Sequence, residues 1–242
     1  MTASSEEHDA QAPNVLVLGI GNLLWADEGF GVRTVEHMYQ NYEVPDNVRL
    51  MDGGTQGLYL VQHVREADYL VVFDAVDYGL EPGTMKLVYD DEVPKFLGAK
   101  KMSLHQTGFQ EVLATAEMLG DYPKGLFLIG VQPVELEDYG GSLRPLVKDK
   151  IEPSIAHAIA YLEKLGISIS KRETPLPEDD GIVGCDVVTL SQYEKERPSE
   201  DEACRIGDER IIMSDAWQGP TFTENGIAEF DIDNVAPPKR DE

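Results

Sequence analysis

The sequence NVLVLGIGNLLWADEGFG, residues 14–31, indicates how this chain folds. Val15–Leu18 is an uninterrupted apolar run, which is typical of a strand buried on both faces. The residues that follow include three that form abrupt turns readily: Gly19, Gly21 and Asn22. A helical pattern begins behind this turn at Gly31. The stretch therefore predicts a buried strand that leads into a helix, with the carboxylates of Asp27 and Glu28 between them, where open α/β sheets bind ligands.

The same alternation of apolar runs and helical patterns continues to about residue 166. Further strands are expected at 48–51, 69–73, 84–89 and 125–131, and helices at 31–42, 58–64, 108–119 and 147–166. The alternating segment 84–89 is expected at an edge of the sheet. The pattern therefore predicts an α/β fold with three αβα layers, around a mostly parallel, twisted sheet of about five strands.

Composition divides the chain into three parts. Residues 1–13 are polar and acidic, and we expect a disordered tail there. Residues 14–166 form the α/β domain, in which no internal repeat is visible. Residues 167–242 are rich in Pro, Asp and Glu, and we expect an acidic, partly ordered extension. Within it, VVTL, RIIM and IAEFDI are candidates for short strands.

The formal net charge of −25 argues against nucleic acids and anionic membranes as partners, because both are bound by basic patches. The chain shows neither a signal-peptide pattern nor an apolar run near the roughly 20 residues that a membrane span needs. Cys185 and Cys204 are the only cysteines and form no CxxC motif, which argues against a thiolate zinc site. We therefore expect a cytoplasmic protein with reduced cysteines.

Acidic residues recur at the ends of the expected strands. Glu28 follows the first strand, Asp52 ends the second and Asp74 ends the third, while His105 is expected in a loop just before a helix. In a parallel sheet these positions meet at one edge. Carboxylates and an imidazole suit zinc, nickel or a similar ion, and clustered carboxylates need a cation or a proton between them. Each residue alone also fits a turn or a helix-entry role.

Two other kinds of site fit the sequence less well. The G-x-G of Gly19–Gly21, with Asp52 after the second strand, resembles part of a dinucleotide-binding motif. Leu24 stands where that motif has its third glycine, and Asp27 and Glu28 place negative charge where a pyrophosphate binds. Ser103 lies close to His105, but the chain has no G-x-S-x-G sequence for a serine nucleophile.

Five motifs together resemble the nickel–iron hydrogenase maturation endopeptidases. They occur in order and with suitable spacing within residues 14–166, and their joint occurrence is far more specific than a single glycine loop. They are GIGNLLWADEGFGVR (19–33), DGGTQG (52–57), FDAVDYG with EPGTMKL (73–87), SLHQTGF (103–109) and LIGVQP (128–133). The likeness is greatest to the proteases that serve membrane-bound uptake hydrogenases, and the tail sequence YEKERPSEDEACRIGDER resembles extensions in that group.

The resemblance implies an enzyme that removes a short C-terminal peptide from the nickel-loaded precursor of the hydrogenase large subunit. It implies metal contacts from Glu28, Asp74 and His105 and an important role for Asp52. The nickel is expected to come with the precursor, and another divalent ion could occupy the site in isolation. The sequence leaves open whether hydrolysis is metal-assisted or uses Asp52 or Asp27 as a general base. The alternatives are a non-catalytic, metal-sensing docking factor and a nucleotide-binding enzyme.

Overall fold

A computed structural model describes residues 12–97, 104–177, 182, 189–196, 221–222 and 228–229. The five-stranded sheet has the order β3-β1-β4-β6-β5. Four strands are parallel: β1 (Val15–Ile20), β3 (Val48–Gly54), β4 (Tyr69–Ala75) and β6 (Gly125–Val131). The edge strand β5 (Met85–Tyr89) pairs antiparallel with β6. The predicted α/β class, the mostly parallel sheet and the place of β5 are thereby confirmed.

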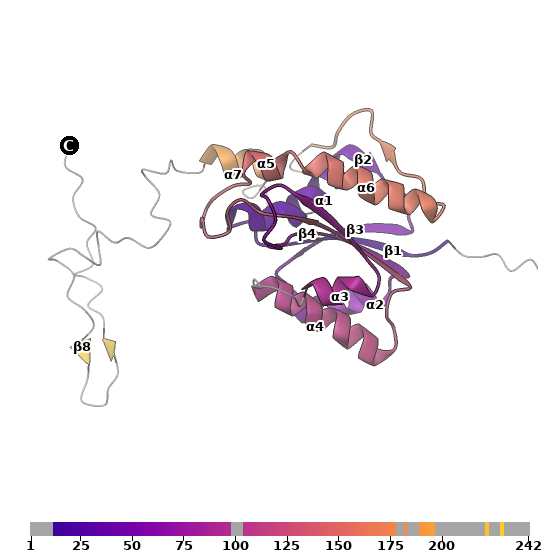
Figure 1. Cartoon of the computed structure of the whole chain (residues 1–242). Coiled ribbons are helices and arrows are strands. Elements are labelled where there is room, and N and C mark those ends of the chain that lie inside the picture. Colours follow the sequence, from indigo (N-terminus) through magenta and orange to yellow (C-terminus); the bar gives the residue numbers. More distant parts are fainter. Residues whose placement is uncertain are drawn as a thin grey trace, which may run out of the picture. The chain divides into compact units, whose positions relative to one another are not determined.

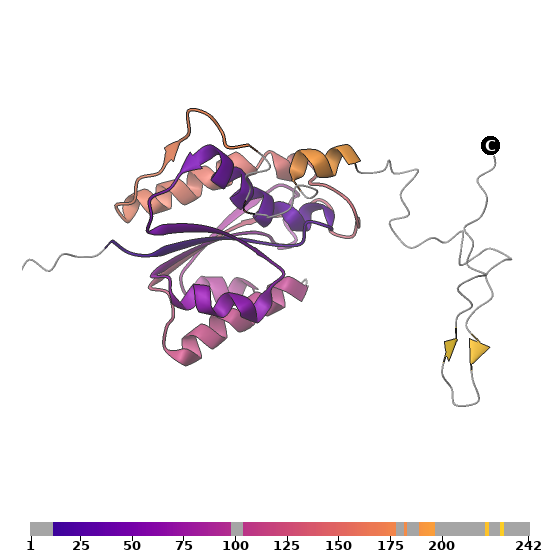
Figure 2. The same cartoon turned by 180° about the vertical axis from the view of Figure 1, so that it is seen from behind.

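Helices cover both faces of the sheet (Figure 1). One face carries α1 (Phe30–Asn41), α5 (Pro145–Lys148) and α6 (Ile151–Lys164). The other carries the 3-10 turn η2 (Gly57–Leu60), α2 (Val61–Arg65), α3 (Glu92–Leu97) and α4 (Leu104–Leu119). The view from behind shows the same three layers (Figure 2). Each layer boundary holds its own apolar core, with Phe73 on the α1 side and Val72 on the α4 side.

Two glycines let α1 approach the sheet closely. A Cβ atom on Gly31 would lie 2.1 Å from the carbonyl oxygen of Phe73, and one on Gly19 would lie 2.3 Å from the carbonyl oxygen of Gly31. Real Cβ atoms do not come so near to backbone oxygens, so any larger residue would push α1 off β1 and β4. The stretch from Gly19 to Gly31 therefore reverses the chain between β1 and α1 and also sets how closely α1 packs on the sheet.

Several expected elements differ from the structure. The helix expected at 108–119 begins at Leu104, so His105 lies in its first turn and not in a preceding loop. The helix expected at 147–166 is divided into α5 and α6, because the Lys150 N–H donates to the Val147 carbonyl, three residues back, and so interrupts the α-helical pattern. In VVTL, Leu190 starts the helix α7 (Leu190–Glu196), and the two valines lie outside the described residues.

The chain divides into two units by its internal contacts, residues 1–197 and 198–242. In the first unit, β2 (Tyr42–Glu43) pairs antiparallel with β7 (Ser170–Lys171), so the start of the acidic extension packs with the α/β domain. In the second unit, β8 (Thr221–Phe222) pairs with β9 (Ala228–Glu229), which lies within IAEFDI. Residues 1–11, RIIM and both cysteines lie outside the described residues. None of the helices in the described ranges has the length and apolarity to span a bilayer.

Candidate functional site

The candidate site lies at the carboxyl edge of the parallel strands. In β3, Asp52 is in register with Gly19 of the neighbouring strand β1, and Phe73 of β4 is in register with the same glycine from the other side. Asp74 follows Phe73 directly. Because successive side chains of a strand alternate between faces, Asp52 and Asp74 leave the sheet on opposite faces. Asp52 shares the α1 face with Phe73, and Asp74 lies on the α4 face.

The Asp52 carboxylate is half-buried near the end of β3, and its environment makes it a weaker acid than usual. One of its oxygens accepts a hydrogen bond from the backbone N–H of Gly54 at 2.8 Å. Burial raises the pKa of Asp52, and this outweighs the lowering by the Gly54 bond and by the positive charge of Arg33. A carboxyl group with a raised pKa that still reaches solvent has the properties of a general base.

Asp74 is almost fully buried, with 1% of its surface exposed. Its register partner is Gly130 of β6, and a Cβ atom on Gly130 would lie 2.9 Å from the hydroxyl oxygen of Tyr78. Tyr78 therefore approaches the same face. Burial, and then the negative charge of Asp74, raise the pKa of the Tyr78 phenol, so the phenol stays neutral beside the carboxylate.

Helix α4 brings His105 to this edge of the sheet. A Cβ atom on Gly108 would lie 3.4 Å from the Cα atom of Gly57, which follows the carboxyl end of β3. The first turns of α4 therefore lie beside the loops of the candidate site, on the face to which Asp74 points. The side chain of His105 itself is outside the described part of the chain. Glu28 is half-exposed in the 3-10 turn η1 (Ala26–Gly29), between β1 and α1 as predicted.

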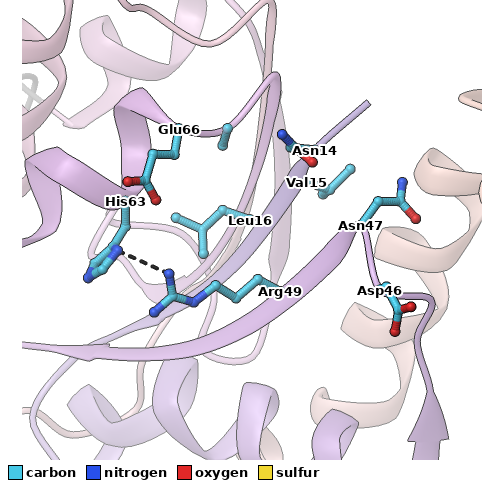
Figure 3. A pocket seen from close by; sticks show the side chains of 9 residues that line it. Asn14, Val15, Leu16, Asp46, Asn47, Arg49, His63 and Glu66 are labelled. Atoms are coloured by element: carbon cyan, nitrogen blue, oxygen red, sulfur yellow. Dashed lines mark hydrogen bonds between the residues drawn. The ribbon is translucent and has the colours of Figure 1, made fainter. Parts of the chain in front are cut away.

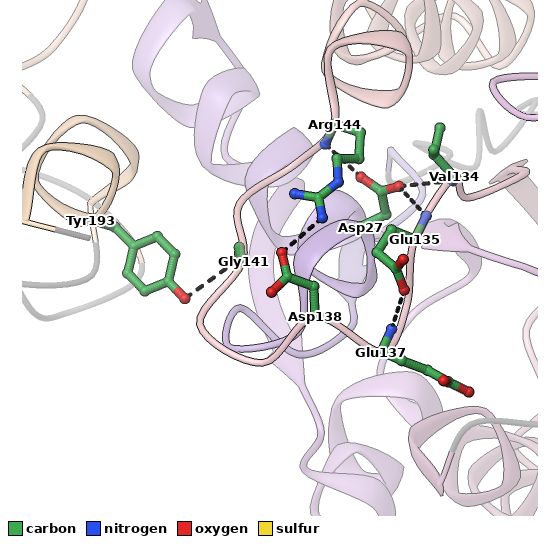
Figure 4. A network of polar contacts seen from close by, with 8 residues as sticks. All are labelled: Asp27, Val134, Glu135, Glu137, Asp138, Gly141, Arg144 and Tyr193. Carbon is green, nitrogen blue, oxygen red and sulfur yellow. Dashed lines mark hydrogen bonds and ion pairs between the residues drawn. The ribbon is translucent and has the colours of Figure 1, made fainter. Parts of the chain in front are cut away.

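Asp27 holds a distant loop in place (Figure 4). Its side chain is completely buried, and its two oxygens accept hydrogen bonds from the backbone N–H groups of Val134, Glu135 and Arg144 at 2.7–2.9 Å. The Asp27 N–H in turn donates to the Glu135 carbonyl. A carboxylate that is fully engaged in this way is poorly placed to take a proton from water. These contacts favour a structural role for Asp27 and leave Asp52 as the better candidate base.

Arg33 is a residue of this region that the sequence reading missed. It is buried in α1, and its guanidinium donates a 2.8 Å hydrogen bond to Glu36. Its charge acts on Asp52, and its guanidinium carbon lies 5.8 Å from the centre of the Tyr193 ring. Tyr193 belongs to α7, so the acidic extension reaches the α1 side of the candidate site. Two signals could have found it: its place within the helical pattern at 31–42 and its position at the end of the motif at 19–33.

Side chains of α7 also hold this helix against the loop that follows β6. Glu194 accepts hydrogen bonds from the Ser142 hydroxyl at 2.8 Å and from the Lys148 ammonium at 2.9 Å. The Tyr193 hydroxyl donates to the Gly141 carbonyl at 3.4 Å (Figure 4). This loop is the one that Asp27 anchors, so α7 and Asp27 hold it from two sides.

A metal cluster is not apparent in the described residues: no three His, Cys, Asp or Glu side chains there are placed to bind one ion. The side chain of His105 lies outside that described part of the chain. The metal set Glu28, Asp74 and His105 therefore stays a prediction. The dinucleotide reading is disfavoured, because a Cβ atom on Gly21 would lie 1.8 Å from the Glu28 carbonyl oxygen. The η1 turn thus fills the space above the G-x-G turn.

A hollow of about 200 Å³ lies at the opposite, amino edge of the sheet (Figure 3). Its lining includes Asn14, Asn47 and Glu66, and a 3.1 Å hydrogen bond joins Arg49 to His63. None of the predicted site residues lines it. The histidine and the acidic residues that line this hollow lie away from the candidate site. They can therefore serve as matched controls for substitutions of the same residue types in the site.

The family of this chain follows from its similarity to known proteins. The model of the family described as hydrogenase maturation protease matches residues 32–161, more than half of the chain. The chain belongs to the hydrogenase maturation protease family. The hydrogenase expression/formation protein HupD of Thiocapsa roseopersicina is 63% identical over 202 residues, which are 84% of this chain and 91% of that protein. The hydrogenase 2 maturation protease of Escherichia coli is 42% identical over 160 residues, 66% of this chain and 96% of that protein.

A solved structure shows the same fold. The hydrogenase maturating endopeptidase HybD from Escherichia coli superposes with a TM-score of 0.63 at 40% identity, covering 66% of this chain and 98% of that one. Family membership confirms the resemblance found in the sequence and makes this chain a peptidase. The match to HupD is too long to fit within residues 1–166, so that relative shares part of the extension.

Proposed function

We propose that this peptidase removes the C-terminal peptide from the nickel-loaded precursor of the large subunit of a nickel–iron hydrogenase, and that it does so in the cytoplasm. The observation that carries the proposal is the pair of carboxylates, Asp52 and Asp74, on either side of β1 at the carboxyl edge of a maturation-protease fold. The named relatives support the hydrogenase as the partner, since they are maturation or expression/formation proteins of hydrogenases.

In this proposal, Asp52 is the general base. Its carboxylate takes a proton from the water that attacks the scissile carbonyl, and it later returns that proton to the leaving amine. Its partial burial supports this role, because a raised pKa strengthens a carboxylate as a base near neutral pH. Asp27 instead shapes the loop beside the site through its three backbone bonds.

Glu28, Asp74 and His105 are proposed to recognise the nickel of the substrate. Two carboxylates and an imidazole are acceptable nickel ligands, and without a thiolate they bind a free ion only modestly. Nickel that the precursor already holds would complete the set, so that an unloaded precursor is not cut. The support for this role is the donor chemistry, the place of Asp74 at the carboxyl end of β4 and the position of the first turn of α4.

The proposal is tested by mixing purified full-length protein with purified nickel-loaded precursor and measuring the intact mass of the large subunit. We expect a loss of mass equal to one C-terminal peptide, with no other protein present. An unchanged mass, together with stable binding, would instead identify a non-catalytic docking factor. Protection from thermal unfolding by nucleotides would favour a nucleotide-binding enzyme.

Matched variants connect the activity to the site. Asp74→Asn and His105→Ala should leave the thermal unfolding temperature close to that of the wild type and block processing. Asp46→Asn and His63→Ala change the same residue types around the hollow at the amino edge and should process normally. Normal processing by both site variants would rule out the proposed metal contacts.

A further inference from the structure

Exposed apolar side chains gather at the edge of the sheet that carries the candidate site. Among the described residues, ten large apolar side chains are exposed, and six of them lie in segments that directly follow the carboxyl end of a parallel strand. All four parallel strands contribute to this set: Leu24 after β1, Leu58 and Tyr59 after β3, Leu80 after β4, and Val134 and Tyr139 after β6. Single exposed apolar residues are common on proteins, so it is their number at this one edge that makes the edge the best candidate for an interaction site.

Three of these residues lie on two loops that backbone contacts join, and we call this set the rim patch: Leu24, Val134 and Tyr139. Their exposed fractions are 42%, 44% and 48%. The backbone of the patch is fixed: the Gly140 N–H donates to the Leu24 carbonyl at 2.7 Å, and the Val134 N–H donates to Asp27 at 2.8 Å. A preformed surface loses little entropy when a partner binds, so exposed apolar groups held rigidly are suited to docking.

Aromatic packing and acidic residues complete this surface. The Trp25 and Tyr139 rings meet edge to face, with centroids 5.2 Å apart. Glu135 and the exposed Glu137 lie between Val134 and Tyr139 in sequence, and the Glu137 N–H donates to the Glu135 carboxylate at 2.7 Å. Both loops of the patch lie beside the candidate site: the loop after β1 leads into the turn that carries Glu28, and the carboxylate of Asp27 binds the loop after β6 to that turn (Figure 4).

We propose that the rim patch docks an apolar segment of the protein substrate next to the scissile peptide bond, and that Glu135 and Glu137 favour basic residues beside that segment. This inference rests on the proposed function, because it takes the hydrogenase precursor as the occupant. The charge of the chain supports a partner segment with positive groups, since a net charge of −25 repels acidic surfaces. For the same reason, a second copy of this chain is a poor occupant.

The test compares two double variants of the full-length protein. Leu24→Ser/Val134→Ser changes the rim patch and leaves its backbone bonds in place. Met118→Ser/Leu119→Ser removes two exposed apolar side chains from the end of α4, where the chain turns back toward the amino end of β6. For each variant, kcat and KM are measured on the nickel-loaded precursor. The dissociation constant is measured by calorimetry in an Asp52→Asn background, and thermal unfolding checks the fold.

For the rim variant we expect KM and the dissociation constant to rise about tenfold or more, while kcat stays within about twofold. The α4 variant should match the wild type. Wild-type KM for the rim variant, or an equal loss in the α4 variant, would overturn the proposal. A dimer that only the rim variant abolishes, with KM unchanged, would identify a second copy as the occupant and would also overturn it.

A second measurement tests the charge. Glu135→Gln/Glu137→Gln should raise KM at low salt, and the difference should shrink as salt screens the interaction. A KM that is unaffected at every salt concentration would remove the basic segment from the proposal. Failure of the two proposals can be distinguished: a wild-type protein that never cuts the precursor contradicts the proposed function, whereas patch-dependent binding of that uncut precursor would still support the docking surface.

Discussion

Asp52 of β3 and Asp74 of β4 lie on the two strands that flank β1, but their side chains leave the sheet on opposite faces. Asp52 aligns with Gly19, and Asp74 comes one residue after the position in β4 that aligns with the same glycine. Two strand spacings of roughly 4.8 Å separate their backbones. The electrostatic surroundings agree with this placement: the charge of Arg33 in α1 lowers the pKa of Asp52, whereas the charge of Asp74 raises the pKa of Tyr78, whose hydroxyl approaches Gly130. The two carboxylates therefore lie at the same carboxyl edge of the sheet, but Asp52 faces the α1 layer and Asp74 faces the α4 layer.

This separation predicts that the two residues have separable effects. Asp52→Asn should lower kcat by about 10²-fold or more and leave precursor binding unchanged, because it removes only the base. Asp74→Asn should abolish the preference for nickel-loaded over nickel-free precursor in calorimetric titrations. Equal effects of the two variants on nickel preference would contradict a division between the faces.

The raised pKa of Asp52 predicts the pH dependence of the reaction. Asp52 must be ionised to act as a base, so kcat/KM should fall as the pH drops through a value above the ordinary 3.8. Arg33→Gln removes a positive charge and should move this acid limb to higher pH, whereas Arg33→Lys keeps the charge and should move it less. The pH profiles of the three proteins are compared, with thermal unfolding as the control for folding. An acid limb that is the same in all three would contradict the link between Arg33 and Asp52.

The raised pKa of Asp52 also predicts how this residue affects stability. Replacing the carboxylate should lower activity without destabilising the fold. Burial favours the neutral form of Asp52, so the ionised carboxylate costs stability at neutral pH, and this cost disappears as the pH falls below the raised pKa. Asp52→Asn should therefore unfold at a temperature equal to or above that of the wild type at pH 7. A clear destabilisation at pH 7 would mean that the carboxylate is bound more strongly by its neighbours than by water.

Asp27 is predicted to be structurally essential. Asp27→Asn places an amide nitrogen against backbone N–H donors and leaves at least one of them without an acceptor. Because buried hydrogen bonds to a charged group contribute about 1.5–3 kcal/mol each, we expect a loss of about 2–4 kcal/mol in the free energy of unfolding, measured in urea. Asp46→Asn is the exposed control. Unchanged stability of the Asp27 variant would argue against its role as an anchor and would restore it as a candidate base.

The close approach of α1 predicts a strong effect at Gly31. A methyl group there meets two backbone oxygens at 2.1 and 2.2 Å, so Gly31→Ala should cost about 3 kcal/mol or more, or prevent folding. Gly108→Ala adds the same methyl group within a helix, where the nearest atom lies 3.4 Å away. This control should be neutral or slightly stabilising, since alanine is the better helix former. Equal urea midpoints for the two variants would mean that α1 adjusts easily.

Much of the fold could be predicted because local signals agree with the tertiary structure. The apolar runs at 69–73 and 125–131 are long enough to identify buried strands, and the alternation at 84–89 identified the edge strand. The start of α4 was predicted too late, because the apolar helical pattern becomes regular only from Phe109 onward. Ser103 stands directly before the helix in the sequence and is the residue type preferred there.

Less of the site could be predicted, because its contacts join distant parts of the chain. The bonds of Asp27 span 107–117 residues, and those of α7 to the loop after β6 span 52. No local pattern encodes such contacts. The sequence placed Asp52 and Asp74 at the correct edge but could not assign their faces, since that depends on strand register. The loop anchored by Asp27, the role of Arg33 and the docking of α7 emerged only from the structure.

The most direct test of the central claim is one intact-mass time course with four samples. Wild-type protein and Asp74→Asn are each mixed with precursor that carries nickel and with precursor that lacks it, and the mass of the large subunit is followed. The account predicts that only the wild type with nickel-loaded precursor releases the C-terminal peptide. Cleavage of nickel-free precursor by the wild type, or cleavage at the normal rate by Asp74→Asn, would contradict it.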